Sequence, residues 1–192
     1  MRKRTPGTRA LILAPFTEPH LSELRDTVDV TYESWLETRL LHEPDELASR
    51  LQTEKIAILV VEADFVFREV FERVPSLRFV GVCRNDTSHV DMEAATERGV
   101  LVVNTPGRNA QAVAEHALGL MLSLARRIPA AHRYVVDGRW ANPAEPYLSL
   151  RGVELAGRTL GIVGLGAIGR RLASLASALG VTCLAYDPYV SD

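Results

Sequence analysis

The sequence predicts an α/β protein built on parallel β-sheets. Short β-branched or apolar runs recur along the 192 residues, and helix-like segments separate them. Parallel strands need a crossover connection, which a helix supplies, so this alternation favours βαβ units. The run Ile56–Val61 is apolar without alternation, as expected for a strand buried on both faces of a sheet.

The first hundred residues predict one flavodoxin-like, doubly wound parallel sheet, because right-handed crossovers place helices on both of its faces. The expected strands are Arg9–Ala14, Val28–Tyr32, Ile56–Val61, Arg78–Cys83 and Val100–Val103. The expected helices between them are Leu21–Thr27, Pro44–Gln52, Phe65–Glu72 and Asp91–Arg98.

A long helix, Ala110–Arg126, is expected after the turn-forming run Asn104–Gly107. Apolar residues wrap most of its circumference, so we expect a neighbouring domain or subunit to bury it. A looser stretch, Pro129–Arg151, separates this helix from a second αβ pattern that begins at Arg158.

Charge and composition exclude several classes of protein. The formal net charge of -2 gives no electrostatic case for nucleic acid or an anionic membrane as a partner. The longest apolar stretch, Ala117–Ala125, is too short to span a bilayer, which needs about 20 residues. Cys83 and Cys183 lie far apart in strand-like surroundings, which suits reduced thiols. We therefore predict a globular cytoplasmic protein.

A glycine-rich turn is the clearest chemical signal. The run Gly164–Gly169, which reads GLGAIG, directly follows an apolar strand, Arg158–Val163, and precedes a helical stretch, Arg170–Leu179. A second strand, Val181–Tyr186, then ends immediately before Asp187. This context is typical of the beginning of a Rossmann dinucleotide-binding domain.

Each residue of the turn has a physical role in that interpretation. Gly164 allows a tight turn, Gly166 lets the backbone approach a pyrophosphate, and Gly169 lets the helix pack close to the sheet. Asp187 accepts hydrogen bonds from ribose hydroxyls and repels a 2′-phosphate, which favours NAD over NADP. The alternative is a purely structural turn. The predicted NAD site comprises Gly164, Gly166, Ala167, Ile168, Gly169 and Asp187.

Four sequence blocks follow one another along the chain, namely Val90–Asp91 with Glu93–Thr96, Val102–Gly107, Ala112–Gly119, and Gly161–Gly169 with Tyr186–Pro188. These blocks and their order resemble the D-isomer-specific 2-hydroxyacid dehydrogenase family, in its phosphoglycerate-dehydrogenase-like branch. Together they cover most of the chain after residue 80, whereas the N-terminal third matches only in its strand–helix pattern.

The resemblance implies two domains. Residues 1–108 would be the substrate (catalytic) domain, lacking its C-terminal return segment. Residues 109–192 would be the start of the NAD-binding domain, truncated after its second strand. The implied reaction is hydride transfer between NAD and a small-molecule 2-hydroxy/2-oxo acid, of the phosphoglycerate or the hydroxypyruvate/glyoxylate type. The resemblance also implies a homodimer.

The same resemblance assigns substrate binding to Arg84, Asn85 and Asp86. Many relatives carry glycines at the second and third of these positions. Asn and Asp are the non-glycine residues that best tolerate positive φ. The Asp86 carboxylate is unfavourable beside an anionic substrate, and Arg84 has the alternative of a solvated strand end.

No catalytic residue and no metal site are predicted in this chain. The family uses an arginine, a histidine and a carboxylate from later strands of the NAD-binding domain. The five histidines here are interpreted as surface or core residues, His89 being nearest the substrate loop. Two alternatives stay open, namely a non-enzymatic NAD-responsive regulator or corepressor of the same fold, and an inactive fragment.

Overall fold

The computed structural model describes residues 7–191. The chain divides into two compact units, with the boundary along the chain between Pro106 and Gly107. We call these unit 1 and unit 2. None of the described helices is long and apolar enough to cross a membrane.

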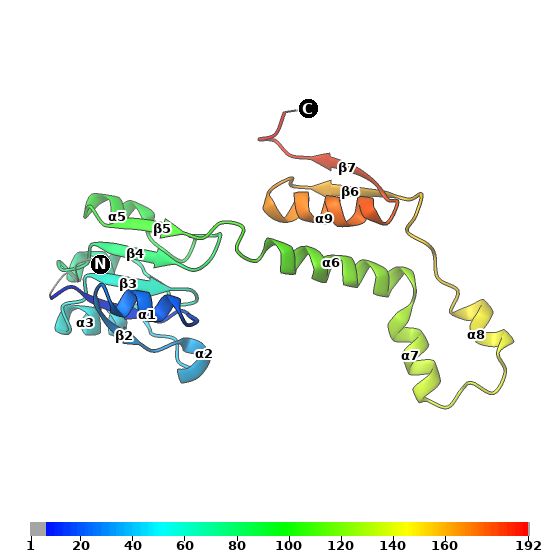
Figure 1. Cartoon of the computed structure of the whole chain (residues 1–192), viewed down its shortest axis with the longest axis horizontal. Helices are drawn as coiled ribbons and strands as arrows, with labels where there is room; N and C mark the ends of the chain where they lie inside the picture. The colour runs from blue at the N-terminus through cyan, green and yellow to red at the C-terminus, as the bar shows by residue number, and fades with distance from the viewer. Residues whose placement is uncertain (1–6, 192) are drawn as a thin grey trace. The chain divides into compact units, whose positions relative to one another are not determined.

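Unit 1 contains a five-stranded sheet in the order β2-β1-β3-β4-β5, and every neighbouring pair of strands is parallel (Figure 1). This is the flavodoxin-like order, so the predicted fold is confirmed. The strands are β1 (Arg9–Ile12), β2 (Asp29–Tyr32), β3 (Ile58–Val61), β4 (Phe79–Val82) and β5 (Leu101–Asn104).

The helices of unit 1 begin where their sequences supply start signals. α3 has Pro44 at its first position and acidic residues in its first turn. α5 is capped by Asp91, whose carboxylate accepts from the Ala94 N–H at 2.8 Å. Among these helices of unit 1, α2 alone was not predicted, because its four residues are too few to show a helical period. The helices are α1 (His20–Arg25), α2 (Trp35–Thr38), α3 (Pro44–Thr53), α4 (Arg68–Arg73) and α5 (Met92–Glu97).

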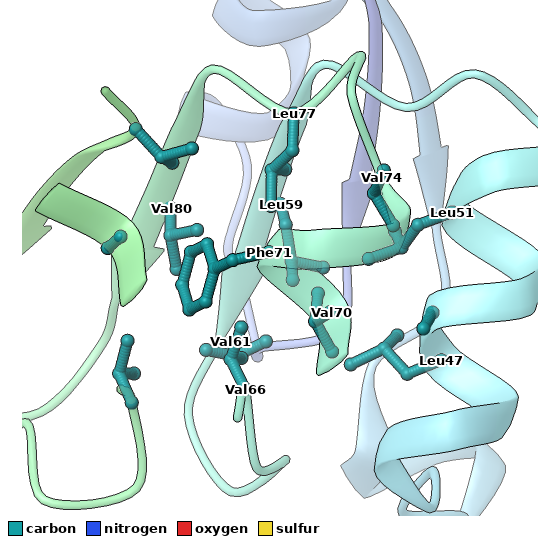
Figure 2. Close-up of a cluster of buried hydrophobic side chains, with 14 of the residues drawn as sticks. Leu47, Leu51, Leu59, Val61, Val66, Val70, Phe71, Val74, Leu77 and Val80 are labelled. Carbon is teal, nitrogen blue, oxygen red and sulfur yellow. The ribbon is translucent and has the colours of Figure 1, made fainter. Parts of the chain in front are cut away.

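The two faces of this sheet are covered unequally. On one face, α3, α4 and α5 bury the larger core, in which Leu47, Leu51 and Phe71 surround Leu59 of β3 (Figure 2). On the other face the buried cluster is small, namely Ala10, Ile12, Ala14 and Val60. An apolar groove of about 590 Å³ lies there, between the sheet and α1.

Unit 2 begins with three helices and then forms a parallel β6–α9–β7 unit, as the glycine motif predicted. The predicted loose stretch is wrong, because α7 and α8 lie within it. Pro129 and Pro146 lie in the first turns of α7 and α8. Backbone N–H groups in a first turn have no partner within the helix, so a proline, which has no N–H, does not break the helix there. The elements are α6 (Ala110–Ala125), α7 (Ile128–Val136), α8 (Ala144–Ser149), β6 (Thr159–Val163), α9 (Ala167–Ala178) and β7 (Thr182–Tyr186).

Two polar residues with buried side chains, Asp64 and His89, lie in the loops that follow β3 and β4. Asp64 is 1% exposed; one carboxylate oxygen accepts from the His42 backbone N–H at 2.9 Å and lies 3.1 Å from His42 Nδ1. His89 is 4% exposed, and its carbonyl accepts from the Val66 N–H at 2.9 Å. Three buried side-chain atoms have no hydrogen-bond partner among the described residues: the two ring nitrogens of His89 and the second carboxylate oxygen of Asp64. Burial, followed by the Arg84 charge, lowers the pKa of His89.

We expect this histidine to make unit 1 less stable in acid. The folded state holds His89 neutral, whereas the unfolded chain binds a proton near its ordinary pKa of about 6.5. Stability should therefore fall as the pH falls through about 6.5 towards the lower pKa of folded His89. His89→Gln should reduce the difference in unfolding free energy between about pH 7.5 and about pH 5.5, measured by urea denaturation. His132→Gln, at an exposed histidine, is the matched control. An unchanged pH dependence in His89→Gln would contradict this account.

Candidate functional site

The glycine-rich turn connects β6 to α9 in unit 2. Gly164 has φ 95°, in the left-handed region that a Cβ disfavours, and its N–H donates to the Tyr186 carbonyl at 2.8 Å. α9 starts at Ala167, with Gly166 as its N-cap. The turn therefore places the first N–H groups of α9, including those of Ala167 and Ile168, beside the carboxyl ends of β6 and β7. A helix N-terminus of this kind favours an anion.

The other two glycines of the turn differ in their surroundings. A Cβ on Gly169 would overlap the carbonyl oxygen of Gly164, so only glycine lets α9 pack this closely on the turn. A Cβ on Gly166 would meet nothing within 4 Å. The backbone of Gly166 is therefore open on the side where a side chain would project. This openness fits the approach of a dinucleotide pyrophosphate to Gly166.

Asp187 lies at the end of β7 and shapes the same turn. Its carboxylate oxygens accept from the Leu165 N–H at 2.7 Å and from the Tyr189 N–H at 2.9 Å. These hydrogen bonds lower the pKa of Asp187, the one from Tyr189 most and the one from Leu165 next. The nearby charge of Arg170 makes a smaller contribution in the same direction. The carboxylate is therefore charged, and it braces the glycine turn directly. The sequence predicted the position of Asp187 relative to the glycine turn, but not these hydrogen bonds.

The predicted substrate residues lie together at the carboxyl edge of the sheet in unit 1, directly after β4. The Arg84 carbonyl accepts from the Thr105 N–H at 3.1 Å, and the Asn85 carbonyl accepts from Asn104 Nδ2 at 2.7 Å. The Arg84 guanidinium makes a long hydrogen bond, 3.5 Å, to the Glu62 carbonyl. The loop is thus tied to the ends of both neighbouring strands, β3 and β5.

Asp86 stabilises this loop by an internal turn. Its carboxylate accepts from the Ser88 N–H at 3.1 Å and from the Ser88 hydroxyl. Both hydrogen bonds lower the pKa of Asp86, and the hydrogen bond from the Ser88 hydroxyl contributes more than the one from the Ser88 N–H. Neither Asn85 nor Asp86 has positive φ, so the loop does not use the backbone tolerance expected of these residue types. The side chain of Asp86, not its φ, sets the conformation.

Sequence reasoning missed the pairing of Asp64 with His42. These residues are 22 positions apart, and no short motif indicates that they meet. Within residues 7–191, no group of three or more His, Cys, Asp or Glu side chains could hold a metal ion.

Comparison with known proteins agrees with these geometries. Residues 118–192 match the family model described as "D-isomer specific 2-hydroxyacid dehydrogenase, NAD binding domain". The whole chain is 40% identical to the Bacillus subtilis protein YoaD, which is named as a 2-hydroxyacid dehydrogenase, and it covers 56% of that protein. Over 72% of its length it is 44% identical to the D-3-phosphoglycerate dehydrogenase of Mycobacterium bovis, and covers 25% of it.

A solved structure shows the same fold. The TT0316 protein of Thermus thermophilus is similar over 96% of this chain, with a TM-score of 0.77 and 32% sequence identity. The chain covers 57% of that protein, so it spans about half or less of the relatives that it matches. The family model confirms NAD as the predicted cofactor. The predicted resemblance is confirmed as well: residues 118–192 match the NAD-binding domain of the D-isomer-specific 2-hydroxyacid dehydrogenases, and the chain is similar to proteins named as 2-hydroxyacid and D-3-phosphoglycerate dehydrogenases.

Proposed function

We propose that this protein is an NAD-dependent oxidoreductase acting on a 2-hydroxy/2-oxo acid. The observation that carries the proposal is the β6–α9–β7 unit, in which open space over Gly166 adjoins the N-terminus of α9 and the charged Asp187. It lies in the region that matches the family's NAD-binding domain. The chain covers about half of its relatives, so the activity is a proposal for the whole protein.

The chain's own residues would divide the binding of NAD between them. The first N–H groups of α9, at Ala167 and Ile168, would hold the anionic pyrophosphate beside Gly166. Asp187 would accept from the ribose hydroxyls while it keeps its hydrogen bond to Leu165. Bound NAD supplies or accepts the hydride.

The substrate side of the proposal rests on the loop after β4. Arg84 would pair with the carboxylate of the 2-oxo acid, because a guanidinium binds a carboxylate through two parallel hydrogen bonds. The backbone of Asn85 and Asp86 would complete this contact. Ser88 and Asn104 hold the loop in shape, so little conformational freedom would be lost on binding.

We also propose the domain assignment that the resemblance implies. Unit 1 would be the substrate domain, and unit 2 would be the start of the NAD-binding domain. The apolar groove between α1 and the sheet supports this assignment. A sheet in an α/β fold is normally covered on both faces, so we expect a further segment to cover the groove. A cytoplasmic location is proposed because Cys83 and Cys183 are both thiols.

Two glycine substitutions should separate binding from folding. Gly166→Val should abolish NAD binding, measured by calorimetry, and leave the thermal unfolding midpoint nearly unchanged, because the new side chain meets only the space reserved for pyrophosphate. Gly169→Ala is the matched comparison and should lower the midpoint, because its Cβ overlaps the Gly164 carbonyl oxygen. Unchanged NAD affinity in Gly166→Val would rule out this site.

We propose a homodimer that uses α6. In a single chain, Leu120 of this helix is 57% exposed and Leu124 is 82% exposed, although α6 is apolar around most of its circumference. Exposed apolar patches of this kind mark protein interfaces. Sedimentation equilibrium should give twice the monomer mass, and Leu124→Glu should give a monomer. Leu40→Glu, at an exposed leucine of unit 1, should stay dimeric. A parent chain sedimenting at 21.1 kDa would contradict the proposal.

Residues 1–192 alone should bind NAD without catalysing hydride transfer. His89, the histidine nearest the substrate loop, is buried and held neutral, so it is poorly placed to exchange a proton with substrate. General acid–base help is typically worth about 10² to 10⁴ in rate. The purified fragment should be assayed with NADH and glyoxylate, hydroxypyruvate or 3-phosphohydroxypyruvate. Turnover by the fragment would show that the active site has been misplaced, with His89 the first residue to substitute.

A further inference from the structure

The segment between α2 and α3 carries a histidine, His42, whose ring lies between a carboxylate and a guanidinium. Its Nδ1 is 3.1 Å from one carboxylate oxygen of Asp64, and its Nε2 is 3.4 Å from a guanidinium nitrogen of Arg50. A guanidinium only donates hydrogen bonds, so Nε2 accepts. In the neutral ring the proton is then on Nδ1, from which it is donated to Asp64. The contacts on its two sides thus select one tautomer and one orientation of His42.

The Arg50 guanidinium is itself held in place. It donates hydrogen bonds of 2.7 Å to both carboxylate oxygens of Glu33, and another of 2.9 Å to Glu54. A guanidinium and a carboxylate paired through two hydrogen bonds have a defined relative geometry. Glu33 directly follows β2, and Asp64 lies in the loop after β3, residues 62–67. A continuous line of polar contacts therefore joins the end of β2 to this loop.

The Asp64 side chain occupies a site where a carboxylate is costly. It is 1% exposed, and the oxygen that accepts from the His42 ring also accepts from the His42 backbone N–H at 2.9 Å. The other oxygen is buried without a hydrogen-bond partner among the described residues. Replacing buried ionic contacts by apolar side chains of similar volume is often neutral or stabilising. Stability alone therefore does not explain a carboxylate at this position.

The loop after β3 holds the end of the predicted substrate loop, residues 84–90. Val66 donates its N–H to the His89 carbonyl at 2.9 Å, and the Val66 carbonyl accepts from the Asp91 N–H at 2.9 Å. Val66 and Val90 thereby form a parallel bridge, and both side chains are buried. The position of Val66 therefore sets where the substrate loop ends.

Asp64 also acts on the substrate loop through its charge. Burial first, and then the Arg84 charge, lower the pKa of His89. The negative charges of Asp86 and Asp64 act on that pKa in the opposite direction, so Asp64 lies within electrostatic reach of the buried ring. Asp64 through its charge and Val66 through its backbone thus both act on the same end of the substrate loop.

We propose that His42 and Asp64 are positioning residues, which hold the substrate loop in the geometry that binds a 2-oxo acid. The inference rests on the proposed function and adds to it two residues that act without touching the substrate. Arg50 fixes the tautomer of His42, and His42 fixes the Asp64 carboxylate. Val66 then transmits the position of the loop after β3 to the substrate loop. NAD binding, which is proposed for unit 2, does not depend on these contacts.

Two matched pairs of variants test the role of the hydrogen bond between these residues. Asp64→Leu keeps the approximate volume of the side chain and loses the acceptor, whereas Asp64→Asn keeps an oxygen that can accept from His42. His42→Ala loses the ring donor. His42→Asn keeps an N–H donor the same number of bonds from the backbone as Nδ1.

The measurement is steady-state kinetics with NADH and hydroxypyruvate, on the protein expressed from its complete gene. Asp64→Leu and His42→Ala should each raise KM for hydroxypyruvate about tenfold, because even a small misplacement by a change remote from the chemistry is costly. KM for NADH should stay unchanged in both. Asp64→Asn and His42→Asn should stay close to the parent protein in both KM values.

Amide hydrogen exchange gives a second readout, which does not depend on turnover. Residues 84–90 should exchange faster in Asp64→Leu and His42→Ala than in the parent protein. Ile56→Val controls for general destabilisation, because it removes one buried methylene at the opposite, amino edge of the same sheet. This control should lower the thermal unfolding midpoint and leave KM for hydroxypyruvate unchanged.

The results that would overturn the inference can be told apart. An unchanged KM for hydroxypyruvate in Asp64→Leu overturns it and leaves the proposed function standing. An equal rise in Asp64→Asn and Asp64→Leu also overturns it, because the acceptor would then not be what positions the loop. If Asp64→Leu does not fold, the two His42 variants decide by the same criteria. Absence of turnover by the parent protein with every 2-oxo acid overturns the proposed function, and the inference fails with it.

Discussion

The parallel pairing of the strands is the constraint on which the rest of unit 1 depends. Because every strand runs the same way, the loops after β1, β3, β4 and β5 emerge at one edge of the sheet. Residues distant in sequence therefore meet there, such as Asn85 with Asn104 and His42 with Asp64. An antiparallel sheet would send alternate loops to opposite edges. The candidate substrate site is in this sense a product of topology, as in other open α/β sheets.

In unit 2, the carboxylate of Asp187 shapes the glycine turn and is also proposed to bind the ribose of NAD. Asp187 accepts from the N–H of Leu165, a residue inside the glycine turn, so the turn and the acidic residue form one hydrogen-bonded unit. This explains why the separation of the two along the sequence is informative. The helix between them must be long enough to return the chain to the strand beside the turn, and α9 followed by β7 does so.

The fold was predictable where a period or a motif was long enough to read. The buried strand Ile56–Val61 and the glycine turn at Gly164–Gly169 both have their structures as predicted. Boundaries shifted by one to three residues, since helix and strand ends depend on tertiary contacts. α2, α7 and α8 escaped prediction because they are short or carry a proline in their first turn.

The candidate sites were predictable only in part. The residues of the glycine turn follow from a local motif, whereas Arg84, Asn85 and Asp86 were indicated only by resemblance to a family. The contacts of Asp64 with His42, and of Glu62 with Trp35, join residues more than 20 positions apart. A single sequence contains no signal for such pairs, because tertiary packing alone brings them together.

The unequal covering of the two faces of the sheet has a consequence for local unfolding. β2 lies at the sheet edge, and none of its residues is buried, whereas β3 and β4 contribute to the core under α3 and α4. Local opening costs least where little apolar surface becomes exposed. Backbone amides of β2 and α1 should thus exchange with solvent hydrogen at lower free energy than those of β3 and β4. The side of the unit that carries the apolar groove is then also the side most able to rearrange around whatever covers it.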